Sequence, residues 1–84
     1  MKSNTDPRFW THFNALPAEI QQLARERFKR WQAHPFHPTL HFKELRPGLW
    51  SVRINQKYRA IAREQPDGVV WFWIGTHNDY DHRV

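Results

Sequence analysis

The sequence predicts an α+β fold in which two N-terminal helices pack on one face of a three- to four-stranded antiparallel sheet. Two observations lead to this prediction. Apolar residues recur at helical spacing before His34, whereas short β-like runs separated by turn residues follow from Leu40. With 84 residues, the chain has room for one domain, residues 1–84, and its five Trp, six Phe and two Tyr suit a small core.

The first helix is expected to begin at Asp6 and Pro7. A carboxylate accepts hydrogen bonds from first-turn amides, and a proline at the first helical position has no amide to leave unpaired. Apolar residues then recur at helical spacing: Phe9, Trp10, Phe13 and Leu16. These features predict a short amphipathic helix.

A second helix is expected to begin at Pro17 and to end at His34, because the residue before Pro35 is disfavoured in the helical region. Its apolar positions form one stripe: Ile20, Leu23, Ala24, Phe28 and Trp31. Charged residues occupy the other positions, as in a helix packed on one side. We interpret the stripe as core.

Four short runs after this helix are typical of strands: residues 40–45, 49–54, 58–64 and 69–75. The turns between them contain Pro47 and Gly48, then residues 55–57, then residues 66–68. Their order predicts an antiparallel meander.

The loop at Asn55 decides which way the arginines of the central hairpin point, because a one-residue change in register moves every side chain to the other face. A two-residue loop would mix charge into both faces, whereas a three-residue loop, residues 55–57, separates two sets. One set is Trp50, Val52, Ile54, Tyr58, Ala60 and Ala62, and the other is Ser51, Arg53, Arg59, Ile61 and Arg63. Burying unpaired guanidinium groups is costly, so we predict the three-residue loop and an open, cationic second face.

The last strand is apolar on both sides, which predicts burial on both faces. Simple alternation places Trp71, Trp73 and Gly75 on one side, and His77 on the same side as Trp73 if the strand continues. The alternative use of such a tryptophan is as a stacking platform for a nucleobase.

Basic residues are concentrated in the predicted sheet. The formal net charge is +5, and between His41 and Arg63 there is a single acidic residue, Glu44, among six basic ones. These are Lys43, Arg46, Arg53, Lys57, Arg59 and Arg63. This distribution indicates a partner that is acidic.

The chain has no cysteine, no apolar leader at its first residues and no run long enough to span a membrane, so a cytoplasmic location is expected. The histidines His34, His37 and His41 are spaced by three and four, but prolines interrupt any helix there. We therefore expect no metal site and no cofactor.

The ordered segments KELRPGLWSVRI, KYRAIARE and WFWIGTHNDY resemble the RelE/ParE superfamily of bacterial type II toxins over about residues 20–80. The resemblance implies two helices on an antiparallel sheet. The N-terminal edge strand usual in the family is not evident in this sequence. Ser51 stands where some members have a second lysine.

The resemblance also implies roles for individual residues. Arg53 matches a basic residue of the active face, Arg59 the central arginine, and His77 the basic or acid–base position ending the last strand. Tyr80 lies near the usual C-terminal tyrosine and would orient or protonate. Further RNA contacts are expected from the basic residues around the hairpin: Lys43, Arg46, Lys57 and Arg63.

These residue types fit RNA cleavage by the 2′-hydroxyl group. Arginine binds phosphate oxygens bidentately and stays charged, so Arg53 and Arg59 suit stabilisation of a dianionic phosphorane. Histidine titrates near neutral pH, so His77 suits proton transfer. The alternatives are an ordinary strand-end histidine and solvated or salt-bridged arginines.

Three functions follow from the resemblance. The first is a ribosome-dependent mRNA endoribonuclease that a cognate antitoxin inhibits. The second is a ParE-like inhibitor of DNA gyrase, and the third is a non-catalytic homologue acting as a binding module. The sequence leaves the codon preference, the antitoxin and the oligomeric state open.

Overall fold

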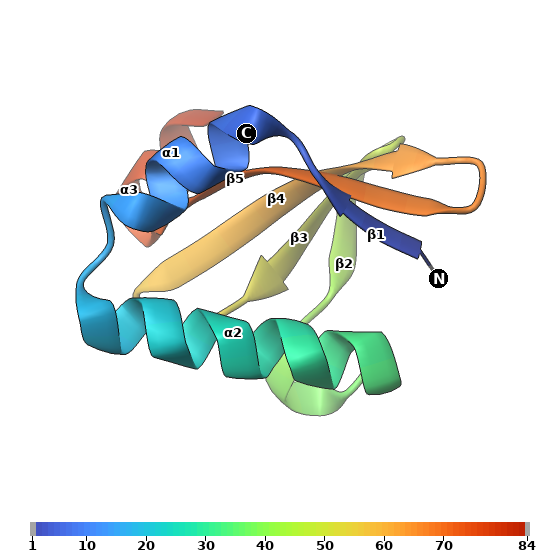
Figure 1. Ribbon diagram of the computed structural model, residues 1–84. Helices are drawn as coiled ribbons and strands as arrows, with labels where there is room; N and C mark the ends of the chain where they lie inside the picture. Colours follow the sequence, from blue (N-terminus) through green and yellow to red (C-terminus); the bar gives the residue numbers. More distant parts are fainter. Residues whose placement is uncertain (1, 84) are drawn as a thin grey trace.

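The computed structural model describes residues 2–83, which form one five-stranded sheet with helices on both faces (Figure 1). The elements are β1 (Lys2–Thr5), α1 (Pro7–Asn14), α2 (Ala18–Ala33), the 3₁₀ turn η1 (Pro38–Leu40), β2 (Lys43–Arg46), β3 (Leu49–Arg53), β4 (Tyr58–Gln65), β5 (Gly68–Thr76) and α3 (His77–Arg83). The strand order is β1-β5-β4-β3-β2. β1 runs parallel to β5, and the other neighbours are antiparallel.

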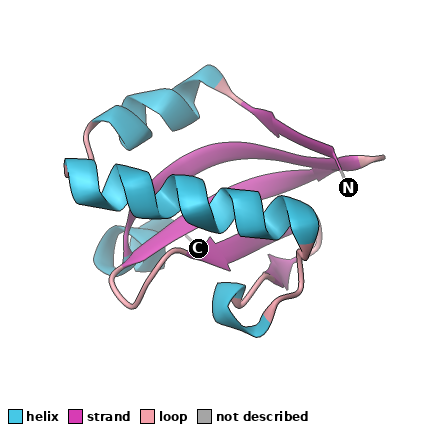
Figure 2. Cartoon of the chain, turned by 60° about the horizontal axis from the view of Figure 1, so that its bottom comes forward, coloured by secondary structure: helices cyan, strands magenta, loops and turns pink. Residues whose placement is uncertain are grey.

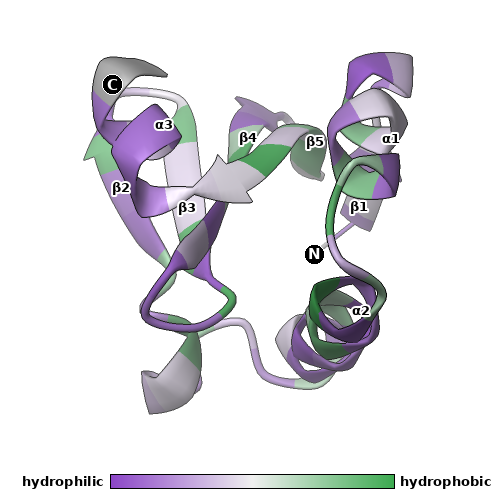
Figure 3. Cartoon of the chain, turned by 90° about the vertical axis from the view of Figure 1, so that its left-hand side faces the viewer, coloured by the Kyte–Doolittle hydropathy of each residue, from purple (hydrophilic) through white to green (hydrophobic). Residues whose placement is uncertain are grey.

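The predicted α+β class and the placement of the helices are confirmed. α1 and α2 lie on one side of the sheet, with α2 crossing in front of it in Figure 2, and α3 lies on the other side in Figure 3. The core between the sheet and the first two helices is rich in aromatic residues, with Trp31, Trp71 and Phe13 fully buried. Trp31 packs edge-on against Trp71, with 5.5 Å between ring centroids. We call the opposite sheet surface the outer face.

The N-terminal strand differs from the prediction. β1 pairs with β5 from Lys2 opposite Gly68 to Thr5 opposite Trp71. Its residues KSNT show no alternation of apolar and polar side chains, so the sequence carries no strand signal there. The strand is held by backbone pairing and by a hydrogen bond of 2.9 Å from the Trp71 indole N–H to Ser3 Oγ. The sheet is therefore mixed and five-stranded instead of antiparallel with three to four strands.

The two predicted helix starts are confirmed. The Asp6 carboxylate accepts from the Arg8 amide at 2.9 Å, and Pro7 is the first residue of α1. Pro17 caps α2, which ends at Ala33 with His34 following as its C-cap.

The predicted hairpin register is also confirmed. Arg53 lies opposite Arg59, and the Ile54 amide donates to the Tyr58 carbonyl at 3.0 Å, which leaves a loop of residues 55–57. The apolar set of the hairpin joins the core beneath the helices: Val52, Ile54, Tyr58, Ala60 and Ala62 are buried there and Trp50 packs against it. The outer face thus receives the arginines.

A β-bulge in β5 corrects the predicted alternation of that strand. Ile61 pairs with Trp73 but Ala62 pairs with Trp71, so the register shifts by one residue at Phe72. Trp71 belongs to the core beneath the helices, whereas Trp73 packs with Ile61 on the outer face. Both indoles are buried, with 1% and 2% exposed, so neither is a stacking platform for a base.

Candidate functional site

The pairing of the strands arranges the outer face in rows. Lys43, Ser51, Ile61 and Trp73 form one row across β2 to β5, and Arg53, Arg59 and Gly75 form the next row toward the hairpin loop. The His77 amide donates to the Lys57 carbonyl at 2.6 Å, which places the start of α3 beside the loop. Four predicted site residues, Arg53, Lys57, Arg59 and His77, are therefore neighbours at this end of the sheet.

Arg53 and Arg59 are like charges placed directly opposite each other on adjacent strands, an arrangement that destabilises a sheet. Both side chains are partly buried. Burial lowers the pKa of the Arg59 guanidinium, and the charge of Arg53 adds to this lowering. The Arg59 Nη1 donates to the carbonyls of Asn55 and Tyr58, which fixes the guanidinium at the mouth of the hairpin.

His77 is the first residue of α3 and keeps about half of its side chain exposed. Its Nε2 lies 3.6 Å from Asp81 Oδ1 on the next helical turn, so a carboxylate faces the ring. Asp81 also favours the charged form of Arg59. Asp81 follows His77 by four residues in the sequence. The helix of residues 77–83 places the two side chains on the same face, one turn apart.

Tyr80 lies on the same helix but is buried, with 7% of its surface exposed. It packs with Ile61 and Trp73 on the outer face, and its ring is nearly parallel to that of His77 with 5.7 Å between centroids. This packing attaches α3 to the sheet and supports the imidazole. The burial favours positioning over direct contact with a substrate.

The remaining predicted residues are more dispersed. Lys43 is exposed on β2 and is the diagonal neighbour of Arg53 on β3, a spacing of about 7–8 Å that long side chains bridge. Arg46 is exposed at the turn between β2 and β3. Arg63 is four residues along β4 from Arg59, about 13 Å away.

Arg63 belongs to a different cluster. Its guanidinium lies over the Phe72 ring at 5.2 Å and 3.8 Å from the Asp6 carboxylate. Arg8 donates two hydrogen bonds to the same carboxylate, at 3.0 and 3.1 Å. The hydrogen bonds from Arg8 lower the pKa of Asp6 to about 2. Arg63 therefore lies on the outer face as predicted, but it contacts Asp6 and Phe72 and stands apart from the cluster at Arg59.

One basic residue near the site was missed by sequence reasoning. Arg27 of α2 follows Ile20 by seven residues and Leu23 by four, so it occupies the apolar stripe of the helix. Its Nε donates to the Ile54 carbonyl at 3.1 Å, directly before the loop of residues 55–57. The sequence signal for Arg27 was its charge at a position of the helix where apolar residues otherwise recur.

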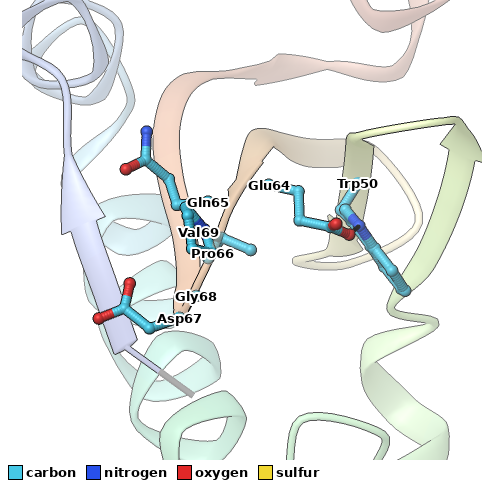
Figure 4. Close-up of a pocket in the computed structure, with 7 residues that line it drawn as sticks. All are labelled: Trp50, Glu64, Gln65, Pro66, Asp67, Gly68 and Val69. Atoms are coloured by element: carbon cyan, nitrogen blue, oxygen red, sulfur yellow. Dashed lines mark hydrogen bonds between the residues drawn. The ribbon is translucent and has the colours of Figure 1, made fainter.

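A hollow at the opposite end of the sheet has a different character (Figure 4). It lies at the turn between β4 and β5 and is lined by Trp50 and residues 64–69. Glu64 accepts from the Trp50 indole N–H at 2.9 Å, and Asp67 pairs with Lys2 at 3.3 Å. Its two carboxylates make it unsuitable for a phosphate.

The histidines before β2 are dispersed. The His37 ring lies 2.9 Å from Thr39 Oγ1, and His41 adopts a left-handed conformation with φ of 44°. Within residues 2–83, no group of three potential metal-ligating side chains is found. Over the same part of the chain, no helix has the length and hydrophobicity needed to cross a bilayer.

Comparison with known families gives a match over most of the chain. The family described as ParE-like toxin domain matches residues 18–82. No curated protein sequence matches the chain.

Solved structures resemble the chain along nearly its whole length. The RelB–RelE antitoxin–toxin complex from Methanococcus jannaschii superposes with a TM-score of 0.73 at 13% identity, covering 94% of this chain and 96% of that one. The RelBE2 toxin–antitoxin complex from Mycobacterium tuberculosis gives 0.71 at 21% identity, covering 90% of each chain. The YoeB/ParE toxin from Agrobacterium tumefaciens gives 0.70 at 18% identity, covering 92% of this chain and 99% of that one. These similarities show a shared fold.

Proposed function

This chain belongs to the ParE-like toxin domain family, within the RelE/ParE superfamily of toxins, and from this premise we propose that it is a ribosome-dependent mRNA endoribonuclease of a toxin–antitoxin system. The observation that carries the proposal is the direct opposition of Arg53 and Arg59 on the outer face beside His77. Two facing guanidinium groups cost stability in the free protein, and a dianionic phosphate offsets that cost.

The reaction uses the RNA as its own nucleophile. The 2′-oxygen forms a bond to phosphorus, the bond to the 5′-oxygen breaks, and one proton leaves the 2′-hydroxyl while another reaches the departing oxygen. Arg53 and Arg59 stabilise the charge that builds on the phosphorane oxygens. His77 carries a proton transfer, a contribution of about 10²- to 10⁴-fold in rate.

Other residues support these groups. Asp81 faces the imidazole, with 3.6 Å between its Oδ1 and His77 Nε2, and orients the ring. Tyr80 holds α3 on the sheet, so its role is positioning. Lys57 and Lys43 flank the arginines and attract the RNA backbone, whereas Arg46 adds charge at a greater distance.

The proposal includes an antitoxin as the partner that restrains the activity, since complexes of this kind are among the structural neighbours. A net charge of +5 suits an acidic segment of such a partner. The site of action is the cytoplasm, where translating ribosomes are found.

Induced expression of the chain in bacterial cells tests the activity. We expect growth arrest with loss of full-length messages, and no arrest from the Arg59→Gln plus His77→Ala variant. Intact messages and continued translation in cells that contain folded protein would contradict an RNase function.

Inhibition of DNA gyrase is the second candidate function, favoured by the ParE-like family match and by the lack of an obvious second acid–base residue paired with His77 in the described part of the site. A supercoiling assay separates the two functions. Inhibited supercoiling with intact messages would support the gyrase function, and a chain inactive in both assays would be a binding module.

A further inference from the structure

A second groove begins where the site of Arg53 and Arg59 ends. It has a volume of about 460 Å³, within the range of about 300–1,000 Å³ typical of ligand sites. Its walls come from α2, η1, the residue after η1, the end of β3 and the hairpin loop: Arg27, Pro38, Thr39, His41, Arg53, Ile54, Asn55 and Gln56. These lining residues include two arginines and a histidine but no carboxylate.

The register of the sheet explains why the groove is open. Lys43 lies opposite Ser51, so continuing this antiparallel pairing by two residues would place His41 opposite Arg53. His41 instead adopts a left-handed conformation, with φ of 44°, and β2 begins only at Lys43. The edge of β3 beside Arg53 is therefore lined by the residues before β2 and not by a paired strand.

Arg27 reaches the groove from beneath the hairpin. Its hydrogen bond to the Ile54 carbonyl uses one N–H of a guanidinium that has five, and it fixes the planar group at the groove. The side chain is only partly buried, so its terminal N–H groups can reach a ligand in the groove. A phosphate group is the ligand that best matches the guanidinium geometry.

Asn55 connects the groove to the arginine pair. Its side-chain oxygen accepts from the amides of Lys57 and Tyr58, at 2.8 and 3.0 Å, so the remaining polar atom of this side chain is an amide donor. Its backbone carbonyl accepts from Arg59. Arg53 itself lines the groove and faces Arg59, so one continuous basic surface extends from His77 to Arg27.

We propose that this groove binds the nucleotide next to the cleaved phosphodiester, with Arg27 and His41 contacting its phosphate and the amides of Asn55 and Gln56 contacting its base. The inference rests on the proposed RNase function and identifies where the substrate chain continues. RNA is favoured because Arg53 is common to both sites, so a strand whose phosphate lies on Arg53 and Arg59 passes into the groove.

Binding of uncleavable oligonucleotides tests the inference. A deoxy-substituted dinucleotide carries one phosphodiester, whereas a deoxy-substituted tetranucleotide carries three, and neither has the 2′-hydroxyl required for cleavage. On titration into the isotope-labelled chain, the dinucleotide is expected to shift amide signals near Arg59 and His77. The tetranucleotide is expected to shift the signals of Thr39, His41 and Gln56 as well.

Variants locate the added contacts. Arg27→Gln is expected to weaken tetranucleotide binding about tenfold, the loss typical of one charged hydrogen bond, and to leave dinucleotide binding unchanged. His41→Asn removes the imidazole while retaining a residue that tolerates the left-handed region, and it is expected to act in the same direction. Arg63→Gln makes the same charge change as Arg27→Gln outside the groove and is the matched control.

Two results would overturn the inference while the proposed function stands. One is a tetranucleotide that shifts only signals near Arg59 and His77, and the other is an equal loss of affinity for both oligonucleotides in Arg27→Gln. Groove shifts produced by an acidic peptide but by neither oligonucleotide would assign the groove to a protein partner and would also overturn it. Failure of the function itself is distinct, because it appears as absent mRNA cleavage during translation by the unaltered chain.

Discussion

At the scale of single residues, the charges of Arg53 and Arg59 do not stabilise the fold. They face each other on β3 and β4, and burial together with their mutual repulsion lowers the pKa of Arg59. The charge of Asp81 acts in the opposite direction on the pKa of Arg59. Charges that destabilise the free protein in this way are typical of sites that bind an oppositely charged ligand.

Replacement of Arg53 by glutamine is expected to raise the free energy of unfolding by about 0.2–1 kcal/mol, the usual cost of an unfavourable cross-strand pair. Denaturant unfolding measures it. Arg63→Gln is the matched control, since Arg63 contacts Asp6 and Phe72 and its loss is not expected to stabilise the protein. A clear loss of stability in Arg53→Gln would show that Arg53 supports the fold.

Asp6 gives the protein a defined acid sensitivity. Its pKa in the folded state is about 2, compared with about 3.9 in an unfolded chain. The unfolded state binds the proton first, so the stabilisation by Asp6 is complete above about pH 4 and is lost as the pH falls toward 2. Asp6→Asn is expected to flatten stability against pH in this window. An unchanged slope in thermal unfolding between pH 2 and 4 would contradict this assignment.

At the scale of elements, the hairpin was predictable from the sequence, whereas β1 and the bulge in β5 were not. Sorting Arg53 and Arg59 away from Val52 and Ile54 required a loop of residues 55–57, and the cost of burying a charge selected it. The polar residues of β1 carry no periodicity. The bulge at Phe72 lies in a strand that is apolar on both faces, so alternation gave no sign of it.

The contact between β1 and β5 depends on Gly68. A Cβ atom at this position would overlap the backbone of Lys2, which no side-chain rotation relieves. Gly68→Ala is therefore expected to separate β1 from β5 and to lower stability by about 1–3 kcal/mol.

Hydrogen exchange measures that separation, because the Asp6 amide donates to the Trp71 carbonyl at 2.8 Å and should exchange faster in Gly68→Ala. Gly48→Ala is the control. A Cβ atom at this position meets no atom within 4 Å, so the substitution strains only the local backbone, whose φ is 80°. Equal protection of the Asp6 amide in the two variants would contradict the pairing.

At the scale of the whole molecule, the two faces of the sheet have different tasks. α1 and α2 cover one face with an aromatic core, whereas the short α3 covers only part of the outer face through Tyr80. The end of the outer face near the hairpin loop remains accessible, and Arg53, Lys57, Arg59 and His77 gather there. The predicted register placed Arg53 and Arg59 on this face, with His77 at its edge, and the strand pairing agrees. It also placed Arg63 on this face, but it did not indicate the contact with Asp6, which lies in a segment with no strand signal.

The most direct test of the central claim is mRNA cleavage in a purified translation system, with message ends mapped to the ribosome position. We expect cleavage by the unaltered chain and by Arg63→Gln. Arg59→Gln and Arg53→Gln are expected to lose about 10²-fold or more in rate while remaining folded, since each removes a donor to the transition state. Cleavage by folded Arg53→Gln and Arg59→Gln at the rate of the unaltered chain would contradict the assignment of the outer face as the active site.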